Sequence, residues 1–128
     1  MPALFKLVFF TLLFFSVNAY SKRALWGETP EDVIRQTVAH LKAGPDDVAL
    51  FHQGVAYADL NQWNKAQIIF QNLSVKHADW PEPKNNLAVT LLKQGQLEKA
   101  QKVIDDAINS QPSFRVAQKN RNSIYEYL

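Results

Sequence analysis

Apolar side chains recur three and four positions apart along most of the chain after residue 29, which is the spacing of one face of an α-helix. No stretch alternates apolar and polar residues long enough to predict a strand. Capping, proline and glycine residues mark where these runs begin and end: Thr29-Pro30, Gly44-Pro45, Asp46, Trp80-Pro81 and Gly95. The pattern therefore predicts an all-α fold of helices joined by short links.

The second half of the chain repeats part of the first at a constant shift. "QWNKAQIIF" at 62–70 returns as "QLEKAQKVI" at 96–104, and the same shift places Gly54 on Ala88. A 34-residue period that holds two helices is typical of stacked helical hairpins, whereas a closed bundle needs no such period. The small residues are expected where the two helices of a hairpin cross, with Gly54 facing Ala66, so that the backbones can approach closely.

With these positions in register, the chain resembles the tetratricopeptide repeat family, whose pattern runs W-x2-L-G-x2-Y, then A-x3-F, then P. The first repeat agrees with this pattern at four positions: Gly54, Tyr57, Ala66 and Phe70. The second repeat carries identical or related residues at six positions: Leu87, Ala88, Leu91, Ala100, Ile104 and Pro112. The tryptophan position departs from the pattern in both repeats, with Leu50 in the first and Lys84 in the second.

The resemblance implies a right-handed α-solenoid of two hairpins, with one helix before them and one after. The predicted organisation is a signal peptide, a linker with an N-terminal helix, two repeats and a C-terminal capping helix: 1–19, 20–46, 47–80, 81–114 and 115–128. The second repeat, "PEPKNNLAVTLLKQGQLEKA" above all, also resembles short exported bacterial proteins that carry this repeat. We therefore expect an exported protein of bacterial type.

Residues 1–19 have the composition of a secretory signal peptide. Lys6 precedes the apolar block Leu7–Phe15, and small residues follow up to Ala19, where cleavage is expected. The block extends only about 14 Å as a helix, against about 30 Å for the hydrocarbon core of a bilayer. The alternative is an uncleaved membrane anchor over Ala3–Ala19. In both cases membrane contact is expected only through residues 1–19, and the rest of the chain is expected in the periplasm or cell envelope.

Charge balance and the absence of cysteine exclude several function classes. The 14 basic and 12 acidic residues give a net charge of +2, without the basic stripe of a nucleic-acid-binding protein. A chain without cysteine has neither disulfides nor thiolate chemistry. The histidines His40, His52 and His77 are too far apart along the chain for the metal-ligand spacing of a single helix. We predict no catalytic residue, no cofactor, no metal site and no enzymatic activity.

In the tetratricopeptide repeat family, the first helices of the hairpins line a concave groove that holds a peptide or a helix of a partner protein. For this chain the resemblance implies six partner-binding residues: Phe51, Val55, Asn85, Val89, Leu92 and Lys119. Chaperone-binding members of the family use Lys and Asn residues in the groove to bind a terminal carboxylate. Only Asn86 of these residues is present here, so we expect the groove to bind an apolar or helical segment instead. The predicted function is an interaction module or scaffold of the cell envelope. The alternative is a self-associating structural subunit whose groove is covered by its own N-terminal or last helix.

Overall fold

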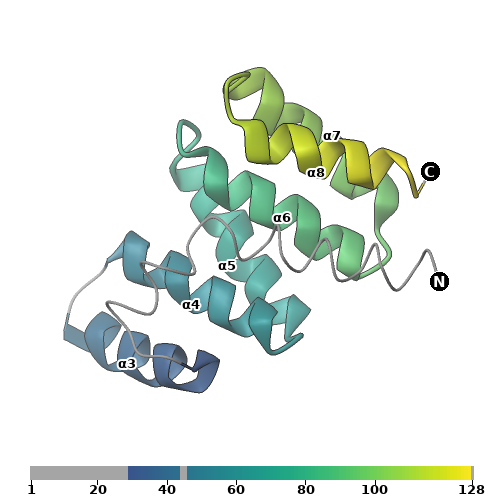
Figure 1. The fold of residues 1–128 in the computed structure, drawn as a ribbon. Helices are drawn as coiled ribbons and strands as arrows, with labels where there is room; N and C mark the ends of the chain where they lie inside the picture. The colour runs from purple at the N-terminus through teal and green to yellow at the C-terminus, as the bar shows by residue number, and fades with distance from the viewer. Residues whose placement is uncertain (1–28, 44–45, 128) are drawn as a thin grey trace.

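The computed structural model describes residues 29–43 and 46–127, so the predicted signal peptide lies outside the described residues (Figure 1). Within the described part, the elements are helices: α3 (Pro30–Ala43), α4 (Asp47–Asp59), α5 (Trp63–Lys76), α6 (Pro81–Lys93), α7 (Leu97–Ser110) and α8 (Arg115–Tyr125). No strand occurs among these residues, which confirms the prediction of an all-α fold.

The helices stack as consecutive hairpins. α4 pairs with α5 and α6 with α7, α3 packs on α4, and α8 packs on α7 and to a lesser extent on α6. In Figure 1 α4, α6 and α8 form one layer, and α5 and α7 lie behind them. Each helix of the second hairpin begins and ends one repeat period after its counterpart in the first. This arrangement is that of a helical solenoid of the tetratricopeptide type.

Local interactions explain where the helices begin and where the hairpins turn. The Asp46 side chain accepts hydrogen bonds from the backbone amides of Val48 and Ala49 at 3.0 and 3.2 Å, and so caps α4. The turn of each hairpin contains one residue in the left-handed region, Asn61 (φ 59°) in the first and Gly95 (φ 77°) in the second. These two residues are one period apart, and they are the residue types that adopt this conformation most easily.

The crossing of α4 and α5 depends on the missing side chain of Gly54. A Cβ atom at this position would lie 2.9 Å from Ile69 Cγ2 and 2.9 Å from Phe70 Cε1. Any side chain at position 54 would therefore collide with Ile69 and Phe70, and the predicted approach of Gly54 to Ala66 stays a prediction. Ala66 is fully buried, as is Ala88 at the equivalent of Gly54 in the second hairpin.

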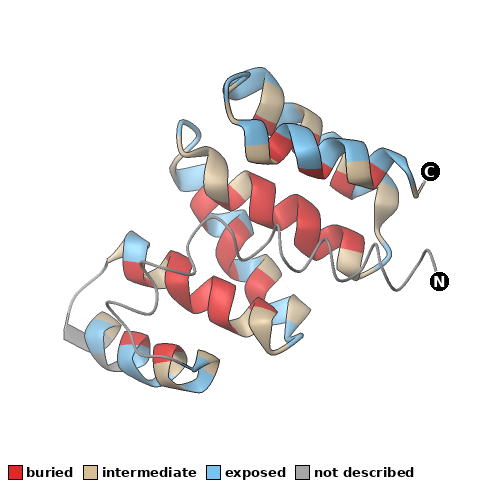
Figure 2. Ribbon diagram, viewed as in Figure 1, coloured by how far each residue is buried: buried red, intermediate tan, exposed pale blue. Residues whose placement is uncertain are grey.

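The two layers differ in how much of each helix is buried (Figure 2). In α5 and α7 the buried residues leave one side of the helix exposed, as expected for an outer layer. In the layer formed by α4, α6 and α8, which we call the inner layer, residues 51–56 of α4 and 85–92 of α6 are buried without interruption. A run of this length covers every direction around a helix, so α6 is enclosed on all sides over this stretch.

Candidate functional site: the first helices of the hairpins

The side chains of α4, α6 and α8 that point away from the second helices form one surface. Gly54 faces α5, and each residue along a helix turns by about 100°, so Val55 and His52 point to a different side of α4. The equivalent positions in α6 and α8 follow one and two periods later. We call this surface the inner face: Val48, His52, Val55, Asn86, Val89 and Asn120.

Most of the predicted partner-binding residues are buried at or beside the inner face. Those on α4 and α6 are Phe51, Val55, Asn85, Val89 and Leu92, and all five have low solvent exposure. Lys119 on α8 is exposed. Their role in binding stays a prediction, since the five side chains on α4 and α6 have little surface in contact with solvent.

Phe51 is held in an aromatic cluster rather than left open to a ligand. Its ring centroid lies 5.7 Å from that of Phe70 and 5.1 Å from that of Trp80, in tilted arrangements. Phe70 belongs to α5, and Trp80 precedes the first residue of α6. The Phe51 side chain therefore joins the first hairpin to the start of the second.

Three buried asparagines form a chain of hydrogen-bonded amides across α6 and α8. Asn120 Nδ2 donates to Asn85 Oδ1 at 2.8 Å, and Asn85 Nδ2 donates to Asn86 Oδ1 at 3.2 Å. All three side chains are 0% exposed. Of the predicted binding residues, Asn85 is thus engaged with the last helix.

The two ends of this amide chain have no partner. Asn86 Nδ2 and Asn120 Oδ1 are buried without a hydrogen bond. A chain of three amides leaves one donor group and one acceptor group unpaired whichever way the amides are oriented. Each unpaired buried group costs about 1–3 kcal/mol. One donor group and one acceptor group of this amide chain are therefore buried without a partner among the protein groups.

Asn120 is not among the predicted binding residues, although the repeat register points to it. His52, Asn86 and Asn120 occupy the same position of the repeat in α4, α6 and α8. All three are buried polar residues on helices of the inner layer. Extending the repeat register into α8 would have placed Asn120 beside the predicted groove.

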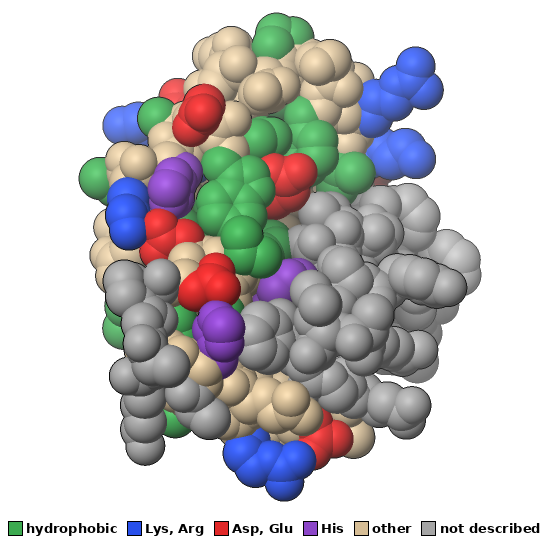
Figure 3. All heavy atoms as spheres, turned by 90° about the vertical axis from the view of Figure 1, so that its left-hand side faces the viewer, with side chains coloured by type: hydrophobic (Ala, Val, Ile, Leu, Met, Phe, Trp, Pro, Cys, Tyr) green, Lys and Arg blue, Asp and Glu red, His purple; other side chains and the backbone are tan. Residues whose placement is uncertain are grey.

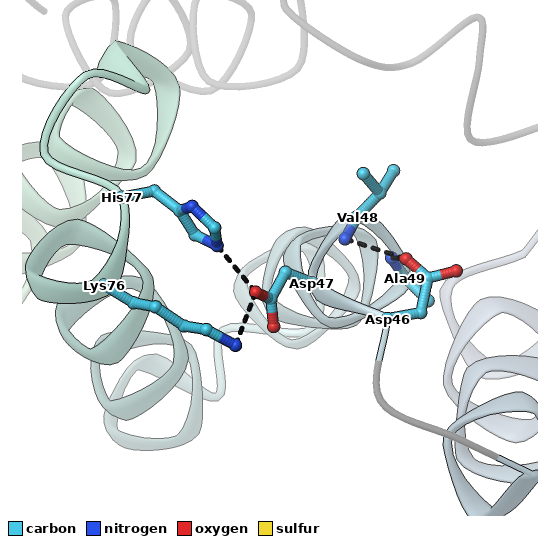
Figure 4. Close-up of polar contacts among 6 residues, drawn as sticks. All are labelled: Asp46, Asp47, Val48, Ala49, Lys76 and His77. Carbon is cyan, nitrogen blue, oxygen red and sulfur yellow. Dashed lines mark hydrogen bonds and ion pairs between the residues drawn. The ribbon is translucent and has the colours of Figure 1, made fainter.

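A second polar cluster surrounds the start of α4 (Figure 4). Asp47 Oδ2 lies 2.7 Å from Lys76 Nζ and 2.6 Å from His77 Nε2. Hydrogen bonds from Lys76 and then His77 hold the pKa of the Asp47 carboxyl below its ordinary value. Because Lys76 and His77 lie at the end of α5, this cluster ties the open end of the first hairpin together.

The neighbouring Asp46 joins this hairpin to α3. His40 Nε2 lies 2.9 Å from Asp46 Oδ2. The hydrogen bond from the Ala49 amide, followed by that of His40, lowers the pKa of Asp46. Figure 3 shows carboxylate and histidine side chains beside hydrophobic ones on this flank of the molecule. The surroundings of both carboxyls are those of structural ion pairs, which hold helix ends in place.

The last helix makes polar contacts with α7 at the surface of the molecule. The Asp105 carboxylate of α7 accepts a hydrogen bond from Tyr125 OH at 2.8 Å. Arg121 Nε lies 3.5 Å from the other oxygen of Asp105. Both contacts fasten α8 to α7, so these side chains serve the packing of the last helix.

The described residues were also searched for a metal site and for a membrane-spanning helix. They contain no group of three or more His, Cys, Asp or Glu side chains placed to hold a metal ion. Among the same residues, no helix has both the length and the apolar character needed to cross a membrane.

Comparison with known proteins agrees with the repeat found in the chain. Residues 48–79 match the protein-family model of the tetratricopeptide repeat. No curated protein matches the chain significantly. The matched segment covers α4 and α5, and α6 and α7 reproduce their lengths one period later. The family match and the repeated hairpin together support a tetratricopeptide repeat protein.

Proposed function

We propose that this chain is a non-catalytic interaction module or scaffold of the cell envelope, which binds a peptide or helix of a partner protein on its inner face. Tetratricopeptide repeats generally mediate binding between proteins, and the match to residues 48–79 supports this class of function. The envelope location is proposed from the signal-like composition of residues 1–19.

The observation that carries the binding proposal is the pair of unpaired amide groups. Asn86 Nδ2 needs an acceptor and Asn120 Oδ1 needs a donor, and both are buried on the inner face. A protein segment offers both kinds of group on its backbone and polar side chains. Binding that supplied both partners would remove two desolvation penalties of about 1–3 kcal/mol each. Val48, which is 52% exposed at the start of α4, gives such a segment an edge at which to enter.

Site-specific photocrosslinking tests this proposal. A photoreactive amino acid at Val48 should give an adduct with one partner protein in cells, because this position borders the inner face. The same amino acid at Ile68, which is 61% exposed on α5, is the matched control and should give no such adduct. The adduct at Val48 should be lost when Asn86→Leu is added and kept when Asn72→Leu, on the exposed side of α5, is added. Equal adducts at both crosslinking positions would contradict the proposal.

A self-associating structural subunit is the second candidate function. The burial of Phe51, Val55 and Val89 favours it, because a covered groove is not free for a partner. Light scattering on residues 20–128 separates the two candidates. A monomer supports the binding module, and a stable dimer or larger assembly supports the structural subunit.

The envelope location has its own test. Alkaline phosphatase fused after residue 28 folds actively only when it is exported, because its disulfides form in an oxidising compartment. Activity of the fusion that disappears when Leu12→Arg interrupts the apolar block would support export. An inactive fusion with intact residues 1–28 would contradict it.

A further inference from the structure

A cleft lies at the edge of the stack where the two helices of the first hairpin connect. It is formed by the turn between α4 and α5, the first turn of α5 and the residue that follows α6, and its volume is about 330 Å³. Ligand pockets of proteins measure about 300–1,000 Å³, so the cleft has room for a small ligand. We call it the turn cleft, and it is lined by Asn61, Gln62, Trp63, Asn64, Lys65 and Gln94.

Trp63 supplies the turn cleft with an aromatic wall. It is the first residue of α5 and is half-buried, because part of its side chain packs against the hydrophobic core. The residue also borders the cleft and stays in contact with solvent. A tryptophan held by the core on one side offers a ligand a large apolar area at a small cost in side-chain entropy.

Two hydrogen bonds orient the amides of the turn cleft. Gln94 Nε2 donates to Asn64 Oδ1 at 2.7 Å, and Gln96 Nε2 donates to Gln94 Oε1 at 3.2 Å. A side-chain amide has two donor hydrogens and two acceptor lone pairs, so Asn64 can still donate from Nδ2 and Gln94 can still accept at Oε1. The turn cleft therefore offers a ligand both kinds of hydrogen-bonding group in a fixed arrangement.

The turn cleft carries little charge. None of the described residues that line it is acidic, and Lys65 is the one cation among them. The Lys65 ammonium lies 5.2 Å from the centroid of the Tyr57 ring, so it is engaged in a cation–π contact. An anionic ligand such as a nucleotide needs free cations for its phosphate groups. The turn cleft therefore favours a neutral ligand.

The second hairpin shows that the fold does not require this chemistry. A cleft of about 470 Å³ lies one repeat period later, where Leu97 and Glu98 stand in place of Trp63 and Asn64. Leu97 packs against the core as Trp63 does, so an aliphatic side chain fills the same place in the array. The aromatic ring and the amide of the first hairpin are therefore more than the packing of a hairpin needs.

We propose that the turn cleft binds a neutral saccharide, with one sugar ring packed on Trp63 and its hydroxyl groups paired with Asn64 and Gln94. The C–H groups of a sugar ring carry a slight positive charge, and the face of an indole carries the negative part of its quadrupole. Each sugar hydroxyl both donates and accepts hydrogen bonds, as the two amides do. The turn cleft shares no residue with the inner face, so this activity goes beyond the proposed function and does not depend on it.

A proline-rich peptide is another neutral ligand that packs on tryptophan. Such peptides dock in grooves lined by aromatic side chains. Trp63 is the single aromatic residue among the described residues of the turn cleft, and the others are amides and Lys65. These amides suit a ligand with many hydroxyl groups better than a proline, which has no N–H donor. The residues of the cleft therefore favour the saccharide.

Nuclear magnetic resonance of the full chain labelled with nitrogen-15 tests this proposal. The probes are maltotriose, cellotriose and the trisaccharide of N-acetylglucosamine. At least one of them should shift the indole N–H signal of Trp63 and leave that of Trp80 unchanged, because Trp80 packs on Phe51 in the aromatic cluster. A Trp63 signal that none of the three saccharides shifts would overturn the proposal.

Substitutions separate binding from folding, with binding followed at the side-chain amide of Gln94. Trp63→Leu gives the first hairpin the residue type of the second and should weaken binding at least about tenfold, whereas Trp63→Tyr keeps a ring and should weaken it less than about threefold. Asn64→Glu removes one donor and should weaken binding about three- to tenfold. Asn72→Leu, on the exposed side of α5, is the matched control and should bind as the natural chain does.

Two further outcomes would overturn the proposal. One is equal affinity of the natural chain and Trp63→Leu for the saccharide that binds. The other is a hexaproline peptide that shifts the Trp63 signal more than any saccharide does, which would identify the turn cleft as a peptide site.

Discussion

Replacing Asn85 by leucine breaks the buried amide chain in its middle. Leucine has the branched shape of asparagine but makes no hydrogen bond, so both the 2.8 Å bond from Asn120 and the 3.2 Å bond to Asn86 are lost. Asn120 Nδ2 and Asn86 Oδ1 then join the two groups that already lack partners. Two newly unpaired buried groups should lower the free energy of unfolding by about 2–6 kcal/mol.

Replacing all three asparagines by leucine should cost less than replacing one. The triple variant also loses both hydrogen bonds, worth about 0.5–1.5 kcal/mol each in net stability, but leaves no amide unpaired. It removes the two groups that are unpaired in the natural chain, with a gain of about 1–3 kcal/mol for each. We therefore expect the triple variant to be about as stable as the natural chain or more stable, and well above the Asn85→Leu variant.

Urea unfolding followed by far-ultraviolet circular dichroism measures these differences, with the free energy taken from the midpoint and slope of each curve. Asn72→Leu, on the exposed side of α5, is the control and should change stability by no more than about 0.5 kcal/mol. A triple variant less stable than Asn85→Leu would refute the reasoning. It would mean that Asn86 and Asn120 are well paired in the folded protein, and the proposed function would lose the observation that carries it.

The other predictions concern the turn, the ion pair and the helix crossing. Gly95→Ala forces a side chain into the left-handed region at φ 77° and should cost about 1–2 kcal/mol in urea unfolding, while Asn61→Gly at the equivalent turn should not destabilise. Asp47→Asn should lower the melting temperature at neutral pH, because Lys76 and His77 hold the pKa of Asp47 below its unfolded value and the ionised form is stabilised. The difference from the natural chain should shrink as the pH falls through the folded pKa of Asp47, and a difference independent of pH would contradict this account. Ala100→Leu should overpack the crossing of α6 and α7 by about 1–3 kcal/mol, since Ala100 is fully buried, and an unchanged melting temperature would tell against that crossing.

The helices and their repeat could be read from the sequence because their causes are local. Apolar spacing of three and four residues gives the amphipathic faces, and Asp46 caps α4 through the nearby amides of Val48 and Ala49. The repeat period then fixes which helices form equivalent hairpins. Such interactions lie within one or two turns of chain, so the order of residues alone determines them.

The sequence predicts which helices line the proposed groove, but it does not predict how far the side chains of the groove are exposed to solvent. The helix period correctly puts Val55 and Val89 at equivalent places on α4 and α6. Whether these side chains meet solvent depends on what lies over them, which no local pattern encodes. Their near-complete burial is therefore a result of the tertiary structure.

The tertiary structure also decided which polar groups meet. Asn120 donates to Asn85 from 35 residues away, and His77 reaches Asp47 across 30 residues. The sequence shows that these residues exist and that Asn86 and Asn120 share a repeat position. Their pairing follows from how α8 settles on α6 and how α5 returns to the start of α4, since a hydrogen bond requires its two atoms to lie within about 3 Å. The sequence by itself determined the helices and their period, and packing determined which buried amide groups were paired and which were left without a hydrogen bond.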